Sequence, residues 1–256
     1  MMEFAAYFLV CENVKDYEFY IWLTLQHNDF LKEHNFVLNT LPFNGGGDTI
    51  VDSINHIKRY FLLVVTDSDK KYINSSLGNT AAKVASHIES LGYQNVKTCW
   101  SYSMEAHEIE NLIPLSLLKL VVGEKKIAIY EKINSTVFGD IFLKYFDFKE
   151  GFRESSYRSI KKNNYPQLSN YREMLLQIGK NDKSLAKSLH KVYNKNNDNE
   201  IVAGLGKTIL GDTLTYLNTH NVSANAITIE KYQLNDWNEI SRRVWSLGCA
   251  MSPQRV

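Results

Sequence analysis

The first half of this 256-residue chain contains four strand-like apolar runs separated by helical patterns. This feature limits its possible folds more than any other. Apolar runs without helical periodicity predict buried strands over residues 5–11, 35–43, 60–66 and 95–102. Helical patterns lie between them at residues 16–34, 49–59 and 79–92. This alternation predicts an α/β fold with a doubly wound, mainly parallel sheet and helices on both of its faces.

The pattern changes after Gly123. Strand-like runs nearly disappear, and amphipathic helical segments rich in Lys, Asn and Tyr follow, among them residues 184–200, 207–220 and 236–250. We therefore expect an α/β domain over residues 1–122 and a mostly α-helical, basic C-terminal domain over residues 123–256.

Charge is divided unevenly between the two halves. Residues 1–114 carry 8 Lys and Arg against 14 Asp and Glu, whereas residues 115–256 carry 21 against 14. An acidic half joined to a basic half is consistent with a cation held by the first part and a polyanion held by the second. Chance variation on two solvated surfaces is the alternative.

The cysteines and the apolar runs indicate the cellular compartment in which the protein is expected. Cys11, Cys99 and Cys249 are far apart and odd in number, so they give neither a disulfide framework nor a zinc spacing. No apolar run approaches the ~18 residues of a membrane helix, and the N-terminal stretch lacks the basic region of a signal peptide. We expect a cytoplasmic protein with no membrane partner.

Acidic residues follow three of the four predicted strands. In a parallel sheet the ends of these strands meet at one edge, where ligands bind. The candidates are Glu12 and Asp16 after the first strand, Asp67 and Asp69 after the third, and Glu105, Glu108 and Glu110 after the fourth.

These carboxylates would repel one another unless a cation compensates. Oxygen ligands without a His or Cys pattern favour a hard divalent ion, Mg²⁺ first and Mn²⁺ next. A single Asp-x-Asp after an apolar strand is more often a loop of solvated acids, but its combination with the other acids is less common. His107 is the one histidine beside the acids and could shuttle a proton, although a plain surface histidine is the more common case.

A glycine loop follows the second predicted strand. Gly45, Gly46 and Gly47 lie just before a predicted helix, where backbone amides can approach a phosphate closely. A tight turn is the plainer interpretation of three glycines.

The glutamate after the first strand, the glycines after the second and the Asp-x-Asp after the third resemble the pattern of the Toprim domain. The spacing of Glu12 and Asp16, the loop "NGGGDTI" and the segment "EAHEIENLI" are similar to the OLD branch of Toprim nucleases. The resemblance covers roughly residues 5–122. Asp48 stands where that branch usually has a lysine, so a phosphate contact from that position would have to come from elsewhere, for example from Lys70 or Lys71.

The resemblance implies roles for these acids. Asp67 and Asp69 would hold a divalent metal that polarises the phosphate, and Glu12 would be a metal ligand or the general acid/base. Asp16 and one of Glu105, Glu108 and Glu110 would complete a second metal site. The catalytic set would then be Glu12, Asp67 and Asp69.

The basic half interleaves charge with aromatic side chains over residues 148–172. Such a surface can contact phosphates and stack bases, although an ordinary solvated helix face is about equally consistent. The candidate nucleic-acid-binding residues are Arg153, Arg158, Lys161 and Lys162.

Together these features predict a divalent-metal-dependent nuclease that hydrolyses phosphodiester bonds of DNA or RNA, including tRNA. The resemblance implies a bacterial antiviral defence effector that acts with a separate ABC-type ATPase partner, because the chain has no Walker motif of its own. The sequence leaves the oligomeric state open, a homo-oligomer included. One alternative is a non-catalytic, Toprim-like nucleic-acid-binding or structural subunit. A phosphatase-type hydrolase is a weaker one, because it normally needs an aspartate after the first strand.

Overall fold

The structure is a computed structural model, and it describes residues 6–27, 38–91, 98–156, 166–181, 185–186, 198, 200–222 and 226–248. The described residues form two compact units. The first lies within Met1–Lys70, Ser75–Leu112 and Leu234–Val256, and the second within Lys71–Asn74 and Ile113–Gln233.

The first unit contains a four-stranded, all-parallel sheet in the described residues. Its strands are β1 (Tyr7–Cys11), β2 (Leu41–Asn44), β3 (Phe61–Thr66) and β4 (Cys99–Ser103), in the order β2-β1-β3-β4. The helices of this unit are α1 (Val14–His27), η1 (Gly47–Thr49), α3 (Ile50–Ile57), α4 (Asn79–Ser90), η2 (Ile109–Leu112) and α13 (Leu234–Gly248). The prediction of an α/β fold with a mainly parallel sheet is confirmed.

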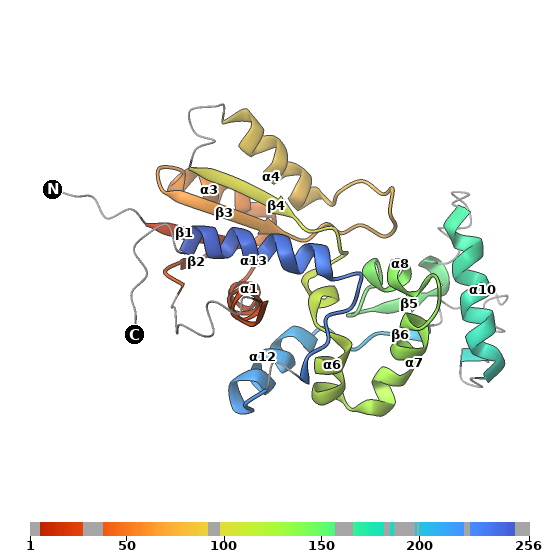
Figure 1. The fold of residues 1–256 in the computed structure, drawn as a ribbon. Coiled ribbons are helices and arrows are strands. Elements are labelled where there is room, and N and C mark those ends of the chain that lie inside the picture. The colour runs from red at the N-terminus through yellow and green to blue at the C-terminus, as the bar shows by residue number, and fades with distance from the viewer. Residues whose placement is uncertain are drawn as a thin grey trace. The chain divides into compact units, whose positions relative to one another are not determined.

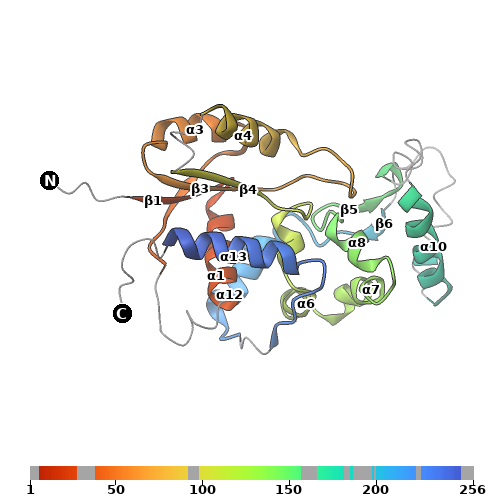
Figure 2. The same ribbon diagram turned by 45° about the horizontal axis from the view of Figure 1, so that its top comes forward.

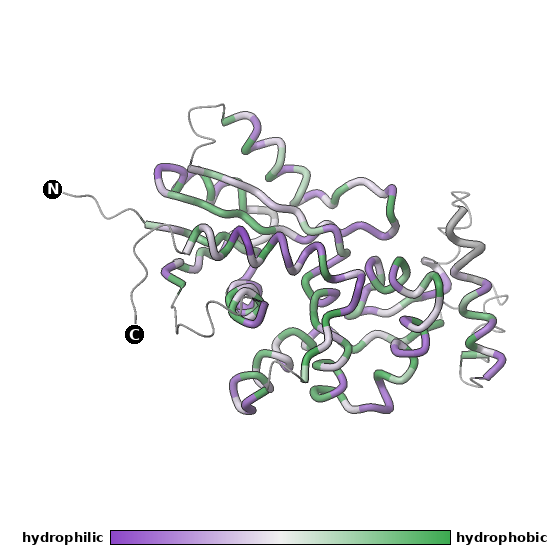
Figure 3. Tube along the Cα trace, viewed as in Figure 1, coloured by the Kyte–Doolittle hydropathy of each residue, from purple (hydrophilic) through white to green (hydrophobic). Residues whose placement is uncertain are grey.

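Helices cover both faces of this sheet. Figures 1 and 2 show α3 and α4 on one face and α1 and α13 on the other. A strand covered on both sides should be apolar at every position, and Leu62, Leu63, Val64 and Val65 of β3 are all at most 2% exposed. Figure 3 shows this strand as a mostly hydrophobic trace.

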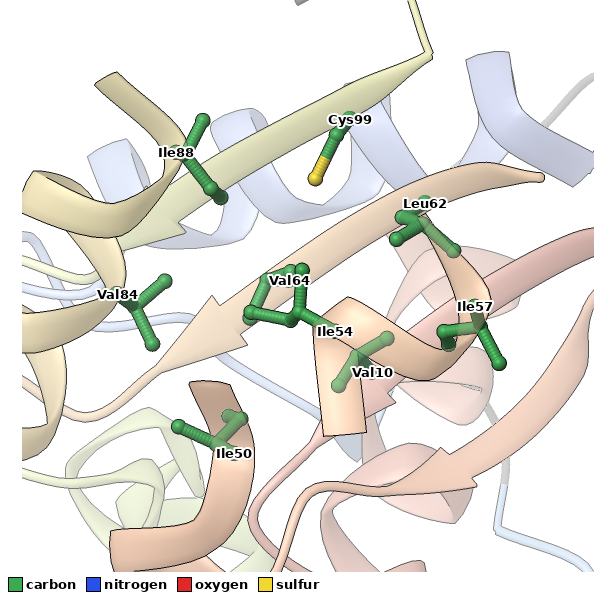
Figure 4. Packing of buried hydrophobic residues seen from close by; sticks show 9 residues of the cluster. All are labelled: Val10, Ile50, Ile54, Ile57, Leu62, Val64, Val84, Ile88 and Cys99. Carbon is green, nitrogen blue, oxygen red and sulfur yellow. The ribbon is translucent and has the colours of Figure 1, made fainter. Parts of the chain in front are cut away.

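The core between the sheet and α3/α4 is built from branched aliphatic side chains. Helical spacing places Ile50, Ile54 and Ile57 of α3 on one buried face. Figure 4 shows these isoleucines packed with side chains of the sheet and of α4: Val10, Leu62, Val64, Val84, Ile88 and Cys99. Burying each Val, Leu or Ile side chain completely stabilises the fold by roughly 1.5–3 kcal/mol.

Helix α13 corrects the predicted domain boundary. The prediction placed all of residues 123–256 in the C-terminal domain, but α13 belongs to the unit that contains the sheet. Its buried face carries Trp237, Ile240 and Val244, each at most 1% exposed. The Trp237 ring meets Trp22 of α1 edge to face, with centroids 5.9 Å apart. The pattern of an amphipathic helix identifies the buried face but not the neighbour against which it packs.

The second unit is mostly helical in its described residues, as predicted. Its helices are α6 (Leu115–Val122), α7 (Glu124–Asn134), α8 (Gly139–Lys144), α10 (Pro166–Asn181) and α12 (Ile209–Thr219). Two short strands, β5 (Gly151–Arg153) and β6 (Glu200–Ala203), form an antiparallel pair. Tyr130, Phe142, Phe146 and Phe148 pack ring against ring at the centre of this unit.

Among the described residues, no helix is long and apolar enough to span a bilayer.

Candidate functional site

The strand order places the loops after β1, β2 and β3 side by side at the carboxyl edge of the sheet. The Gly45 N–H donates to the Cys11 carbonyl oxygen at 2.7 Å, and the Gly46 N–H donates to the Glu12 carbonyl oxygen at 3.2 Å. These two bonds hold the glycine loop against the end of β1.

Two of these glycines have backbone angles that disfavour any other residue. Gly46 and Gly47 have φ angles of 67° and 55°, in the left-handed region. A Cβ atom on Gly47 would lie 4.0 Å from Oε2 of Glu12. The Glu12 carboxylate therefore faces this loop, and the bare glycine leaves room beside it.

The loops after β3 and β4 are joined by hydrogen bonds. The Ile109 N–H donates to Oδ1 of Asp67 at 3.0 Å. The Asp69 N–H donates to the His107 carbonyl oxygen at 2.9 Å, and the Ser68 hydroxyl donates to the Ala106 carbonyl oxygen at 2.5 Å. The segment with Glu108 and Glu110 is thereby fixed beside Asp67.

Five carboxylates lie close enough in this region to affect one another's ionisation. Burial raises the pKa of Asp16, and the charges of Glu110 and Glu12 act in the same direction. Hydrogen bonds from Asn13 oppose them, and together these effects bring the pKa to about 7. Burial also raises the pKa of Asp67 well above its ordinary value, and the charges of four neighbours add to this. These neighbours are Asp16, Glu110, Glu12 and Glu108.

The cluster is partly enclosed by protein, and Glu12, Asp67 and Glu108 are half-buried. Asp16 and Glu110 are each 5% exposed. Burial, followed by the charges of Asp16 and Asp67, raises the pKa of the Cys11 thiol well above its ordinary value. Cys11 is completely buried and stays protonated, so it serves as a small apolar residue of the strand.

Asp69 and Glu105 are held outside this group. Asp69 is the one non-glycine residue of the described part with a positive φ, 53°. Its carboxylate packs against Gly78, where an added Cβ atom would meet Oδ2 at 2.0 Å. Oε1 of Glu105 accepts a hydrogen bond from the Asn235 side chain at 2.9 Å. The structure therefore brings together Glu12, Asp16, Asp67, Glu108 and Glu110, and it directs Asp69 and Glu105 elsewhere.

One residue that holds the site was not anticipated from the sequence. Asp236 of α13 is 1% exposed, and its carboxylate accepts from the Tyr102 hydroxyl at 2.6 Å and from the Glu105 and Ala106 N–H groups at 2.8 and 2.9 Å. It anchors the start of the loop that carries Glu108 and Glu110. The sequence feature that could have indicated this role is an aspartate next to a tryptophan on the apolar face of a predicted helix.

The candidate basic residues lie in different places. Lys70 follows Asp69 in the first unit and is half-buried, whereas Lys71 is exposed and belongs to the second unit. Arg153 of β5 lies 3.6 Å from a carboxylate oxygen of Glu150 and 3.7 Å from one of Glu200. Arg158, Lys161 and Lys162 lie outside the described residues.

The chemistry of the cluster suits a hard divalent cation, because all of its ligand atoms are carboxylate oxygens. The pKa values of Asp16 and Asp67 are raised in part by repulsion between neighbouring carboxylates, and a bound cation would reduce this repulsion. In the part of the chain that the structure describes, however, no group of three or more His, Cys, Asp or Glu side chains is arranged to hold a metal ion. The carboxylate oxygens are suitable ligands for a metal ion, but the side chains would have to move closer together to coordinate it.

No protein-family model, no curated protein and no solved structure matches this chain. The fold therefore defines the protein only as an α/β protein with an all-parallel four-stranded sheet and a mostly helical second unit in the described residues.

Proposed function

We propose that this protein is a divalent-metal-dependent nuclease whose site is the carboxylate cluster at the carboxyl edge of the sheet. The observation that carries this proposal is the half-buried Asp67, whose pKa is raised by burial and by four neighbouring carboxylates. Groups of like charge are rarely gathered without a cation or a proton to compensate them. Strongly shifted pKa values of this kind are typical of functional sites.

The arrangement of the loops supports a Toprim-like site of the OLD type. Glu12 follows β1, the glycine loop follows β2 and Asp67 follows β3. β1 and β3 are neighbours in the sheet, with Val10 opposite Val64, so Glu12 and Asp67 emerge side by side. Asp48 in place of the usual lysine and the orientation of the Asp69 carboxylate toward Gly78 are departures from that pattern.

In this proposal Glu12, Asp16, Asp67 and Glu110 hold Mg²⁺ or Mn²⁺, which would polarise the phosphate and help to orient a water molecule. The Ile109 N–H fixes one oxygen of Asp67, which leaves the other for a ligand. Gly47, which has no side chain, lies beside the Glu12 carboxylate, and the substrate phosphate would bind at this loop. Glu12 is also placed to accept or donate a proton at the reacting oxygen.

The proposal extends to partners. The substrate would be DNA or RNA, bound in part by basic residues of the second unit, and a separate ABC-type ATPase would control cutting, as in OLD-like systems of bacterial antiviral defence. Fold-level analogy supports this last step.

The test is cleavage of a panel of labelled DNA, RNA and tRNA substrates with Mg²⁺, with Mn²⁺ and with EDTA. We expect metal-dependent cleavage that Asp67→Asn and Glu12→Gln reduce by about 100-fold or more. Asp52→Asn, at an exposed position in the first turn of α3, is the matched control and should cut normally. Equal cleavage by the parent and both site variants would refute the assignment.

A second candidate is a non-catalytic, metal-stabilised subunit that binds nucleic acid. The observation that favours it is the orientation of Asp69 toward Gly78 and of Glu105 toward Asn235, which leaves fewer acids for a two-metal site. For this candidate, Mg²⁺ would raise the melting temperature of the parent but not of Asp67→Asn, and no substrate of the panel would be cut.

A further inference from the structure

A pocket of about 460 Å³ lies at the opposite end of the sheet from the carboxylates. Its sheet side is formed by Tyr7, the first residue of β1, by Phe61, the first of β3, and by Trp100, the second of β4. Small-molecule sites in proteins typically have volumes of roughly 300–1,000 Å³ and mostly apolar walls. The size and lining of this pocket therefore suit a small organic ligand.

Three aromatic rings form a stack across the floor of this pocket. Tyr7 and Phe61 have centroids 5.0 Å apart and planes 13° apart. Phe61 and Trp100 continue the stack at 6.3 Å and 17°. Trp100 ends it on the edge strand β4 and is 40% exposed. One further planar aromatic ring could extend the stack on its open side.

Two arginines from α13 line the same pocket. Arg242 and Arg243 share Oε2 of Glu239, at 2.8 Å and 3.0 Å. One carboxylate cannot neutralise two guanidinium groups, so the pocket has an excess positive charge. Arg243 also lies over the Tyr102 ring, 5.1 Å from its centroid, which fixes its position. Arg242 remains 60% exposed and can turn toward a ligand.

We propose that this pocket binds a nucleotide, with the base against the Trp100 ring and the phosphate at Arg242 and Arg243. An aromatic stack favours a planar heterocycle, and arginine is the side chain best suited to phosphate oxygens. Both features occur within one pocket of mononucleotide size. This site is separate from the carboxylate cluster, so the proposal does not depend on nuclease activity.

The test is isothermal titration calorimetry of the full-length protein in EDTA with AMP, GMP, CMP and UMP. We expect saturable binding of at least one of them with a stoichiometry of one. The corresponding nucleoside and inorganic phosphate, titrated separately, should each bind about tenfold more weakly or worse, because each makes only half of the contacts.

Variants assign the binding to this pocket. Trp100→Leu and Arg242→Ala should each weaken binding about tenfold, whereas Glu239→Gln should strengthen it, because it releases both arginines. Arg59→Ala is the matched control, since Arg59 also lies over an aromatic ring, that of Tyr60, but outside the pocket. It should bind like the parent. Arg242→Glu serves as a second charge variant should Trp100→Leu fold poorly.

Three results would overturn the proposal. The first is the lack of saturable binding for all four mononucleotides, and the second is normal binding by both Arg242 variants. The third is binding of single-stranded oligonucleotides alone, which would make the surface a strand-binding site. Asp67→Asn should keep its nucleotide affinity, so failure of the nuclease proposal would leave this result unchanged.

Discussion

At the scale of single residues, Asp67 is the carboxylate of the candidate site on which four other carboxylates act. Asp67 is half-buried, and both the loss of water around its carboxyl group and the negative charges of Asp16, Glu110, Glu12 and Glu108 oppose its ionisation. The hydrogen bond from the Ile109 N–H satisfies only one of its oxygens. A charge in this position costs stability unless a cation or a proton accompanies it.

Asp67→Asn should therefore stabilise the metal-free protein. The amide has nearly the same shape and can still accept from the Ile109 N–H, but it removes one negative charge from the cluster. We expect the free energy of unfolding in EDTA at pH 8 to rise by about 1–3 kcal/mol, measured by urea denaturation. A decrease in stability would mean that the Asp67 carboxylate is already compensated in the folded protein.

Asp16 gives a pH dependence with a definite sign. Its pKa in the folded protein is raised to about 7 from an ordinary value of 3.8, so the unfolded state releases its proton first as the pH rises. The protonated Asp16 therefore adds to the free energy of unfolding. This contribution is complete below pH 4 and is lost as the pH rises toward 7 and beyond. A difference of this size corresponds to at most about 4 kcal/mol.

We expect the stability of the parent protein in EDTA to fall between pH 4 and pH 7 more steeply than that of Asp16→Asn. Urea denaturation at several pH values measures both slopes. Identical slopes would show that Asp16 ionises normally, and added Mg²⁺ should flatten the parent's slope by stabilising the ionised form.

At the scale of elements, the loop after β4 depends on a helix more than 120 residues away in the sequence. Asp236 of α13 accepts hydrogen bonds from the Tyr102 hydroxyl and from two successive backbone amides, those of Glu105 and Ala106. The same loop then supplies the Ile109 N–H to Asp67. The position of Glu108 and Glu110 relative to Asp67 is thus set partly by α13.

Asp236→Ala should destabilise the protein by about 2–4 kcal/mol, because it leaves the buried Ala106 amide, the Glu105 amide and the Tyr102 hydroxyl without their acceptor. It should also reduce hydrogen-exchange protection of the Glu105 and Ala106 amides. Asp236→Asn keeps one oxygen as an acceptor and should have an intermediate effect. Unchanged exchange at these two amides in the alanine variant would contradict the anchoring role.

At the scale of the whole molecule, the sheet-containing unit is built from segments at both ends of the chain. Residues of α1 and of α13 cover the same face of the sheet, and the Trp237 indole N–H donates to the Leu112 carbonyl oxygen at 2.9 Å. Without α13, the apolar side chains of α1 and the sheet that it covers would face water.

A fragment of residues 1–112 should therefore fail to fold cooperatively, whereas the same fragment joined to residues 234–256 by a flexible linker should recover a cooperative transition. Thermal unfolding followed by near-ultraviolet circular dichroism distinguishes the two. A cooperative transition in the shorter fragment would show that α13 is dispensable for this unit.

Local sequence patterns were sufficient for the elements of the sheet. The continuous apolar run that ends at Thr66 is β3, and the isoleucines at 50, 54 and 57 define the buried face of α3. Strand bounds were less accurate where turn and strand residues mix: the second strand was predicted over residues 35–43, and the structure has β2 at Leu41–Asn44. Residues 28–37 lie outside the described part.

Part of the candidate site could likewise be predicted from the sequence, and part could not. Alternation of strands and helices already implied that Glu12 and Asp67 would meet, because parallel strands end at one edge. Which of the three glutamates after β4 joins them could not be read from the sequence, since it depends on the turns of an irregular loop. In the structure, Glu108 and Glu110 lie close enough to Asp67 to raise its pKa, whereas Glu105 accepts a hydrogen bond from the Asn235 side chain.

The sequence by itself determined the parallel α/β unit and the acids at its carboxyl edge, because both follow from the period of the apolar side chains along the chain. Only the tertiary structure decided that α13 completes this unit, that Asp236 fixes the acidic loop and that two arginines meet an aromatic stack at the opposite end of the sheet. Each of these contacts joins residues far apart in the sequence, and no local pattern records which distant partner a buried face will meet.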